Sequence, residues 1–355
     1  MSAATDLVDL DRLEPWLVER GILVGPEPLA AAPLGEGHSN LTYTLSRGDT
    51  SLILRRPPRG PLLPTAHDVI REAAIMQLLD GQVPVPQVAG VCDTPDVIGA
   101  PFYLMQSVDG VVVRDRLPDF LGGAASSKSR TSLGIDVARV LGQIHRVPWK
   151  PFVAAGYGKE SGYLERQLRR WSGQREGVRA AVAESGGRAR DLPDYDVLRD
   201  WLVAQMPAEV EPTVVHGDYK LDNLIVRSAP EGHGGVEISA VIDWEMATVG
   251  DPRADLGYLL SFWPEPGEVL PLATLVTSAE GFPLRSEMIE IWEESSGRRI
   301  GDPRWFMAMA VWKLAILLEA SYYRYLAGTA DDPFFAQLEL GVPALFSRAR
   351  RIADV

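Results

Sequence analysis

Two strand-like runs near the middle of the sequence constrain the fold more than any other feature. The first run is Leu224–Val226, and the second is Val236–Ile242 after a glycine-bearing turn at residues 231–235. Apolar runs separated by such a turn are typical of a β-hairpin. Pairing of the two runs would return Asp243, which directly follows the second run, to the side of Asn223, which directly precedes the first. The hairpin therefore predicts a polar site that is anchored on rigid strands.

The polar loop that leads into the hairpin carries Asp218 and Asn223, which are separated by four residues. This is the spacing of a kinase catalytic loop. Phosphoryl transfer requires a carboxylate beside the attacking hydroxyl and oxygen ligands for magnesium. Lys220, two residues after Asp218, is in a natural position to meet the transferring phosphate. We therefore expect Asp218, Asn223 and Asp243 to converge in a phosphoryl-transfer site.

These motifs carry a resemblance to a known family. The stretch HGDYKLDN, followed by IDWE and GDPRADL, resembles the aminoglycoside phosphotransferase-like family, the small-molecule relatives of protein kinases. The resemblance extends from about residue 30 to residue 330. It implies an α+β, bilobal, protein-kinase-like fold, with a β-rich N-lobe, a larger α-helical C-lobe and a central catalytic hairpin. It also implies that ATP and Mg²⁺ are the cofactors.

The same resemblance implies a role for individual residues of the motifs. Asp218 would be the catalytic base, and Asn223 and Asp243 would be the magnesium ligands. His216 would be a scaffold residue rather than a proton shuttle. Asp255 would brace the catalytic loop through hydrogen bonds.

The secondary-structure pattern predicts two lobes. Strand-like runs at 41–45, 51–55 and 102–108 and a helix that Asp68 caps, continuing to about Leu79, predict an N-lobe over residues 1–107. The rest, 108–355, reads as a helical C-lobe that contains the hairpin and the substrate-binding region. Within it, we expect a helix over 133–145 and polar loops at 121–131 and 183–190.

A turn near the N-terminus is a candidate for covering phosphates. Gly35, Gly37 and Ser39 lie in a polar turn before the first strand-like run. The backbone N–H groups of such a turn, with the Ser39 hydroxyl, can approach a phosphate. A plain hairpin loop explains the two glycines equally well. No P-loop of the Gly-x-x-x-x-Gly-Lys type is present in the sequence.

A cation and a carboxylate in the N-lobe form the next candidate pair. Arg55 stands where the resemblance expects a lysine on the third strand, and an arginine can bind phosphates with two N–H groups. Alternation along the strand places Arg55 and Arg56 on opposite faces. Glu72, in the first turns of the following helix, is the candidate partner of Arg55. The alternatives are that one arginine is solvated and the other is paired on the surface, and that Glu72 is an ordinary exposed helix acid.

The end of the last N-lobe strand is a candidate adenine site. Gln106 and Val108 lie in the segment that connects the two predicted lobes. In kinase-like folds this hinge offers backbone groups to adenine. The assignment rests on position alone, because backbone contacts leave no side-chain signature.

Charge and cysteine content limit the class of protein. The formal net charge of −13 disfavours a nucleic-acid binder, because phosphate contacts require a surplus of Lys and Arg. Such a charge can attract cationic substrates or simply favour solubility. No secretory leader and no run of about 18 apolar residues is present, and Cys92 is the only cysteine. We expect a cytoplasmic protein without a membrane or nucleic-acid partner.

Two helical segments indicate which class of small molecule could accept the phosphate. Residues 163–171 and 312–324 are similar to a branch of the family that is fused to acyl-CoA dehydrogenases and linked to hydroxyacyl-CoA metabolism. The arginines at 166, 169 and 170 can meet an anionic group such as a CoA phosphate, or they can form a solvated helix face. Glu319 can instead meet an amino sugar. The acceptor hydroxyl thus belongs to an aminoglycoside-like or a hydroxyacyl-CoA-like small molecule.

Three other functions would each require different sequence features from those of a small-molecule kinase. A non-catalytic nucleotide-binding relative, acting as a sensor or scaffold, would not need a competent residue at every catalytic position, and this sequence has one at each. A protein kinase would need an activation segment, but Gly250-Asp251-Pro252 follows soon after Asp243 and no Ala-Pro-Glu motif is present. An acyl-CoA dehydrogenase would need a flavin site, of which the sequence shows no trace. The sequence favours a small-molecule kinase.

Overall fold

The computed structural model describes residues 7–35, 40–58, 68–123, 126–229, 234–272, 276–330 and 332–355. The chain divides into two compact units, each described here by itself. The N-terminal unit comprises residues 1–111 together with 223–227 and 238–247, and the C-terminal unit comprises 112–222, 228–237 and 248–355. Part of the central hairpin therefore belongs to the N-terminal unit, although it is distant in the sequence.

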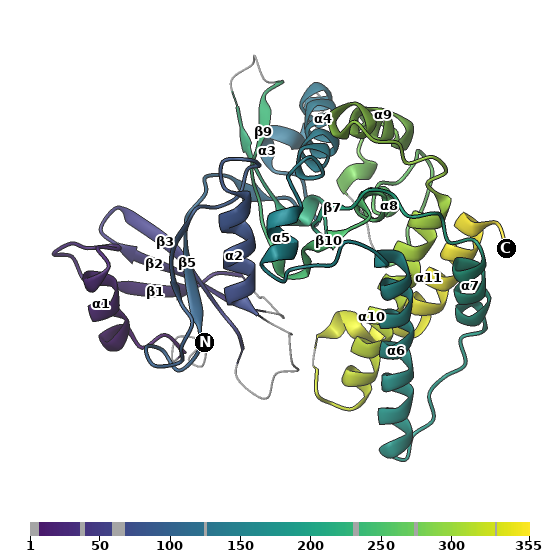
Figure 1. The fold of residues 1–355 in the computed structure, drawn as a ribbon, viewed down its shortest axis with the longest axis horizontal. Helices are drawn as coiled ribbons and strands as arrows, with labels where there is room; N and C mark the ends of the chain where they lie inside the picture. Colours follow the sequence, from purple (N-terminus) through teal and green to yellow (C-terminus); the bar gives the residue numbers. More distant parts are fainter. Residues whose placement is uncertain are drawn as a thin grey trace. The chain divides into compact units, whose positions relative to one another are not determined.

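A five-stranded antiparallel sheet forms the centre of the N-terminal unit (Figure 1). Its strand order is β1-β2-β3-β5-β4. The strands are β1 (Ala30–Pro33), β2 (Leu41–Arg47), β3 (Thr50–Arg56), β4 (Val88–Cys92) and β5 (Phe102–Gln106). The strand-like runs that the sequence predicts in this region are confirmed, and β5 ends at Gln106, two residues earlier than expected.

Two helices flank this sheet. Helix α1 (Leu10–Glu19) places Leu13, Trp16 and Leu17 in an apolar core with residues of β2, β3 and β5, and Trp16 packs edge-on against Phe102 at 5.0 Å. Helix α2 (Val69–Leu79) packs against β4 and β5 and begins after Asp68, whose carboxylate accepts the backbone N–H of Arg71 at 2.9 Å. This N-cap confirms the predicted start of the helix.

The C-terminal unit is mainly helical. Its helices are α3 (Asp119–Gly122), α4 (Ser127–Ile144), α5 (Lys150–Ala154), α6 (Tyr163–Glu184), α7 (Pro193–Ala204), α8 (Pro252–Ser261), α9 (Arg285–Ser296), α10 (Arg304–Leu326) and α11 (Leu338–Ala353). Strands β7 (Thr213–Val215) and β10 (Thr248–Gly250) pair antiparallel. A three-stranded sheet of order β6-β8-β9 comprises β6 (Val111–Val112), β8 (Leu224–Ser228) and β9 (Val236–Val241), so the predicted hairpin is present. Most of β8 and β9 belongs to the N-terminal unit.

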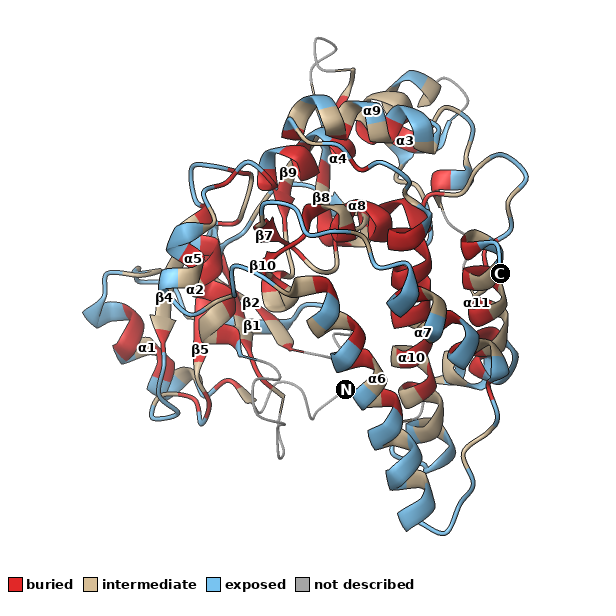
Figure 2. Cartoon of the chain, turned by 45° about the vertical axis from the view of Figure 1, so that its right-hand side comes forward, coloured by how far each residue is buried: buried red, intermediate tan, exposed pale blue. Residues whose placement is uncertain are grey.

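Helix α10 is the core helix of the C-terminal unit. It packs against α6, α7, α8 and α11, and most of residues 305–316 are buried (Figure 2). By length and composition alone α10 would suffice to cross a membrane, but 72 % of its most apolar window is buried inside the protein. A core helix passes the same composition test, so this feature is weak evidence for a membrane span.

The predicted loop at 121–131 is wrong over its second half. Helix α4 begins at Ser127, although its first turn is rich in serine and would favour a loop by propensity. Tertiary contacts explain the difference, because the buried Arg130 donates to the carbonyls of Leu121, Gly123 and Glu280. These hydrogen bonds stabilise a helical turn that local sequence does not indicate.

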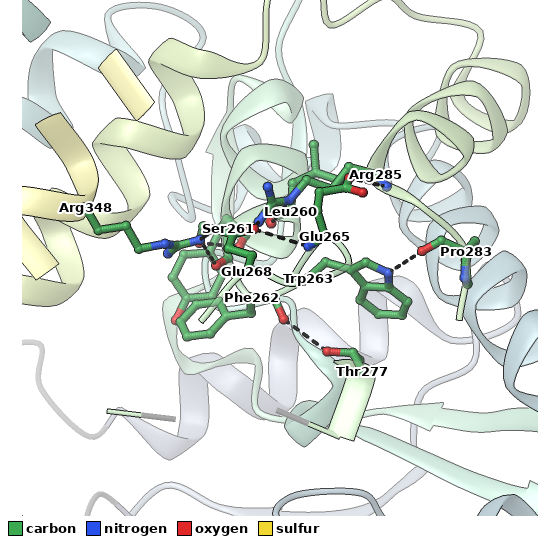
Figure 3. Close-up of polar contacts among 11 residues, drawn as sticks. Leu260, Ser261, Phe262, Trp263, Glu265, Glu268, Thr277, Pro283, Arg285 and Arg348 are labelled. Carbon is green, nitrogen blue, oxygen red and sulfur yellow. Dashed lines mark hydrogen bonds and ion pairs between the residues drawn. The ribbon is translucent and has the colours of Figure 1, made fainter. Parts of the chain in front are cut away.

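A polar network fixes the chain that follows α8 (Figure 3). The carboxylate of Glu268 accepts hydrogen bonds from Arg285 at 2.6 Å and from Arg348 at 3.2 Å. Trp263 donates from Nε1 to the carbonyl of Pro283 at 2.8 Å. These contacts attach the C-terminal end of α8 to α9 and α11, and α8 carries residues of the candidate site.

Candidate functional site

The N-terminal unit pairs the two charged residues that the sequence analysis proposed as partners. Arg55 on β3 places Nε 3.1 Å from Oε2 of Glu72 on α2. Glu72 is completely buried, so it is not the exposed helix acid of the alternative interpretation. The neighbouring Arg56 is also buried and donates to the carbonyls of Pro57, Leu7 and Ile98, so neither arginine is a solvated surface residue.

Arg55 also contacts the end of the hairpin. Its Nη2 donates to Oδ1 of Asp243 at 2.8 Å and lies 4.0 Å from Oε2 of Glu245. Asn40 donates to Oε2 of Glu245 at 3.1 Å. Asp243 has a φ of 66°, a left-handed conformation that is uncommon for a residue with a side chain. Such strain occurs at functional sites, where the surroundings over-determine the backbone.

Burial and charge act together on the Arg55–Glu72 pair. Burial raises the pKa of Glu72 to about 7, although Arg55 opposes this shift and Asp243 and Glu245 increase it. Burial acts to lower the pKa of Arg55, but Glu72, Tyr103, Asp243 and Glu245 together outweigh it, so this pKa is raised. The guanidinium therefore remains charged, and two further carboxylates share it with Glu72.

Asn223 and Asp243 supply oxygen atoms at adjacent points of the hairpin. The backbone N–H of Ile242 donates to the carbonyl of Asn223 at 2.9 Å. Asn223 is thus hydrogen-bonded to the residue that directly precedes Asp243, the other predicted magnesium ligand. Among the described residues, no group of three or more His, Cys, Asp or Glu side chains could hold a metal. One carboxylate and one amide oxygen nevertheless fit Mg²⁺, which completes its shell with water and phosphate oxygens.

The structure describes only some of the other residues that the sequence predicts to contact the nucleotide. Gly35 is exposed with a φ of 77°, whereas Gly37 and Ser39 lie outside the described residues. The backbone N–H of Gln106 donates to the carbonyl of Gln87 at 2.8 Å, so that donor is already used within the sheet. Val108 follows the end of β5.

In the C-terminal unit, the catalytic loop follows β7. Gly217, with a φ of 83°, makes the turn that presents Asp218, whose side chain is 23 % exposed. Nζ of Lys220 lies 3.6 Å from Oδ2 of Asp218. Oδ1 of Asp218 accepts a hydrogen bond from the hydroxyl of Tyr258 on α8. The two carboxylate oxygens of Asp218 therefore contact different side chains, Oδ1 that of Tyr258 and Oδ2 that of Lys220.

Asp255 braces the catalytic loop, as the resemblance implied. Its buried carboxylate accepts the backbone N–H groups of His216 at 2.6 Å and of Gly217 at 2.9 Å. It also meets Nε2 of His145 at 3.3 Å, and Nδ1 of His145 accepts from Nε1 of Trp292 at 2.9 Å. Because Nδ1 is an acceptor, Nε2 carries the proton and donates to Asp255.

The pKa of Asp255 is lowered even though burial acts to raise it. The hydrogen bonds from His145 and from the backbone N–H of Gly217 oppose burial and favour the carboxylate form. His216 is itself fully buried, and its Nδ1 accepts the backbone N–H of Asp218 at 3.2 Å. This geometry is that of a scaffold residue.

Lys313 on α10 contacts the same loop from another side. Its Nζ donates to the carbonyl of Gly217 at 2.8 Å and lies 4.9 Å from the ring centre of Tyr258 and 5.3 Å from that of Trp171. Burial lowers the pKa of Lys313 to about 8, and the charges of Asp218 and Asp255 act against this shift. A lysine this close to the loop can influence Asp218 directly.

Sequence reasoning missed Tyr258 and Lys313 as residues of the site. A signal existed for each. Tyr258 lies one helical turn after Asp255, on the same face of α8. Lys313 is the only charged residue between Trp305 and Leu318.

The acidic candidate for an amino sugar is engaged elsewhere in the same unit. Glu319 is buried and accepts hydrogen bonds from Nε of Arg190 at 3.0 and 3.1 Å, so its carboxylate is not exposed to a ligand. Of the arginines of α6, Arg166 donates to the carbonyl of Ser161, and Arg170 lies over the ring of Trp171 at 4.8 Å. Neither contact excludes an anionic ligand.

The antiparallel sheet with its Arg–Glu pair, and the helical unit with its braced catalytic loop, define a protein of the kinase-like class. Residues 30–291 match the model of the phosphotransferase enzyme family. The chain belongs to this family of phosphotransferase enzymes. This confirms the resemblance found in the sequence.

Three known proteins illustrate the similarity. Over 335 residues the chain is 33 % identical to acyl-CoA dehydrogenase family member 10 of Mus musculus, covering 92 % of this chain but only 30 % of that protein. A crystal structure from Ralstonia eutropha, provisionally assigned as an aminoglycoside phosphotransferase, is 29 % identical and covers 98 % of both chains with a TM-score of 0.78. A thermostable mutant of aminoglycoside phosphotransferase APH(4)-Ia, in complex with AMP-PNP and hygromycin B, is 16 % identical over 96 % of this chain and 97 % of that chain, with a TM-score of 0.57. These structures confirm the predicted α+β, protein-kinase-like fold.

Proposed function

We propose that the protein is an ATP- and Mg²⁺-dependent phosphotransferase that moves the γ-phosphate to a hydroxyl of a small molecule. The observation that carries the proposal is the catalytic loop of the C-terminal unit. There Asp218 is partly exposed, Lys220 lies 3.6 Å away, and Asp255 fixes the loop backbone at His216 and Gly217. A fixed carboxylate with a neighbouring cation is what phosphoryl transfer to a hydroxyl requires.

In this proposal Asp218 accepts the proton of the acceptor hydroxyl as the new bond to phosphorus forms. Lys220 faces the transferring phosphate and compensates its negative charge. Both residues act from the C-terminal unit, whose helical regions also bind the acceptor. We propose that phosphoryl transfer requires Asn223 and Asp243 in addition to Asp218.

The N-terminal unit is the nucleotide-covering part in this proposal. Gly35, Gly37 and Ser39 approach the phosphates, and Arg55, oriented by Glu72, binds them with its guanidinium. The carbonyl of Gln106 and the backbone of Val108 meet adenine. Asn223 and Asp243 would hold magnesium, which neutralises charge on the phosphates when it is bound.

The acceptor is the least constrained part of the proposal. A protein of the same fold was crystallised with hygromycin B, which supports an aminoglycoside-like acceptor. The similarity to an acyl-CoA dehydrogenase family member supports a hydroxyacyl-CoA-like acceptor, and the arginines at 166, 169 and 170 suit its phosphates. We propose that the protein acts in the cytoplasm, without a nucleic-acid or membrane partner.

The experiment that tests the proposal is ADP release from Mg-ATP in the presence of aminoglycosides, amino alcohols and hydroxyacyl-CoAs. One class should stimulate release, and Asp218→Asn should lower this activity by roughly 10³-fold or more because the base is removed. Asp222→Asn is the matched control, since Asp222 lies on the same loop, and it should retain activity within about threefold.

Two outcomes would overturn the proposal. Equal turnover by the wild type and Asp218→Asn would exclude Asp218 as the base. Tight ATP binding without stimulation by any acceptor class would favour a non-catalytic nucleotide-binding protein.

A further inference from the structure

We propose that Tyr258 and Lys313, the positioning pair, orient Asp218 for proton transfer and are required for turnover but not for nucleotide binding. The inference rests on the proposed function, because it takes Asp218 as the base. All three residues belong to the C-terminal unit. The pair comes from two helices, Tyr258 from α8 and Lys313 from α10.

Tyr258 fixes the side chain of Asp218 directly. Its hydroxyl donates to Oδ1 of Asp218, whereas Oδ2 of the same carboxylate lies 3.6 Å from Nζ of Lys220. Burial, followed by the charge of Asp218, raises the pKa of Tyr258 well above its usual value. The phenol therefore remains a hydrogen-bond donor throughout the physiological pH range.

The ring of Tyr258 is itself held in place. The ring packs edge-on against Phe262, with 4.9 Å between the two ring centres. Nζ of Lys313, from α10, lies 4.9 Å from the centre of the Tyr258 ring. A tyrosine whose ring is contacted by both Phe262 and Lys313 is suited to fix the direction of a carboxylate.

Lys313 fixes the backbone that precedes Asp218. It accepts no proton in the reaction, but its Nζ donates to the carbonyl of Gly217. Asp255 takes the N–H groups of His216 and Gly217, and His216 takes the N–H of Asp218. The consecutive peptide groups that lead to Asp218 are thus all hydrogen-bonded to side chains.

A buried lysine in an apolar helix needs an explanation. Lys313 is 9 % exposed, and the charged groups that face it are Asp218 and Asp255, which favour its charged form, and Arg170 and Lys220, which oppose it. A hydrophobic residue would fill this position of α10 at a lower desolvation cost. The desolvation cost of a lysine beside the catalytic loop favours a role in activity rather than in stability.

The first test compares Tyr258→Phe with Tyr195→Phe. Both tyrosines are buried in the C-terminal unit, and Tyr195 stacks on Trp312, next to Lys313 in the chain, without contacting Asp218. Tyr258→Phe should lower kcat by roughly tenfold or more and leave the KM for ATP within about twofold. Tyr195→Phe should leave both constants within about twofold. Unchanged kcat in Tyr258→Phe would overturn the role of Tyr258.

The second test is a double-mutant cycle. If Tyr258 acts through Asp218, then Tyr258→Phe should have no further effect on the residual activity of Asp218→Asn. Additive effects would mean that Tyr258 acts elsewhere. The cycle also separates the two hypotheses, since normal turnover in Asp218→Asn alone would overturn the proposed function, not merely the positioning pair.

The third test addresses Lys313. Lys313→Met keeps the length and apolar body of the side chain but removes the donor to Gly217, and it should lower kcat by roughly tenfold with an unchanged KM for ATP. Lys313→Arg retains a charged donor and should recover part of the loss. An undiminished kcat in Lys313→Met, with wild-type ADP affinity measured by calorimetry, would overturn the role of Lys313.

Discussion

The guanidinium of Arg55 donates to the carboxylate of Asp243 at 2.8 Å, although the two residues are 188 positions apart in the sequence. The same guanidinium lies 3.1 Å from Glu72. Arg55 thus connects the helix carboxylate to a proposed magnesium ligand within one compact unit. This relationship fixes a positive charge between two carboxylates in the unit that we propose to cover the nucleotide.

Removal of Arg55 should weaken nucleotide binding. Arg55→Met deletes charge-assisted hydrogen bonds, which are worth about 1.5–3 kcal/mol each, and should raise the Kd for Mg-ADP by roughly 10–100-fold. Calorimetric titration with Mg-ADP measures the change. Arg20→Met is the control, because Arg20 is a surface residue directly after α1 whose ion pair with Glu19 is exposed. An unaltered Kd in Arg55→Met would contradict the assignment of Arg55.

Magnesium dependence should distinguish Asp243 from Glu245, two acids of one short turn. Asp243→Asn removes a proposed ligand charge and should raise the Mg²⁺ concentration for half-maximal activity by about tenfold or more. Glu245→Gln keeps an oxygen that can accept from Asn40 and should change it by about threefold at most. The measurement is ADP release against free Mg²⁺. An equal change in the half-maximal Mg²⁺ concentration for both variants would contradict the assignment of Asp243, rather than Glu245, as the magnesium ligand.

The stability of the protein should rise with pH in the range where Lys313 titrates. Its pKa is lowered from 10.5 to about 8 in the folded state, so the unfolded chain binds more protons between these values. The free energy of unfolding therefore increases as pH rises from about 8 to 10.5, by roughly 3 kcal/mol at most. Below pH 8 the full penalty of burying the charge is present.

Lys313→Met is the variant that isolates this contribution. At pH 7 it removes the penalty but leaves the carbonyl of Gly217 without its donor, which costs about 1–3 kcal/mol, so the two effects nearly offset. Denaturant titrations at pH 7 and pH 10 should show that the variant loses stability relative to the wild type as pH rises. A constant difference between the two proteins would show that Lys313 does not titrate in this range.

Local sequence patterns were sufficient for the elements whose contacts are short-range or carry a motif. Neighbouring residues indicate the cap at Asp68, the strand that bears Arg55 and the hairpin. The pair Arg55–Glu72 is expected from the resemblance to kinase-like proteins, not from local pattern. Asp255 was identified because it lies in a motif. Its partners, the N–H groups of His216 and Gly217, confirm the bracing role.

Contacts between distant segments were not accessible in this way. The start of α4 depends on Arg130, whose acceptor at Glu280 lies 150 positions away. Lys313 reaches a carbonyl 96 positions away, and no spacing rule connects the two. Such contacts depend on how helices pack, which a single sequence specifies only through the summed burial of many side chains.

The N-terminal unit is assembled from three separate stretches of the chain, the last of which ends at residue 247. During synthesis from the N-terminus, its five-stranded sheet can be made early, but Asp243 and Asn223 are supplied only after more than a hundred residues of the other unit have left the ribosome. A fragment that stops at residue 111 would lack both proposed metal ligands and the carboxylate partner of Arg55 on the hairpin. Competence for nucleotide binding is therefore a late event in the biosynthesis of this chain, and the two units cannot be exchanged between relatives by a single crossover.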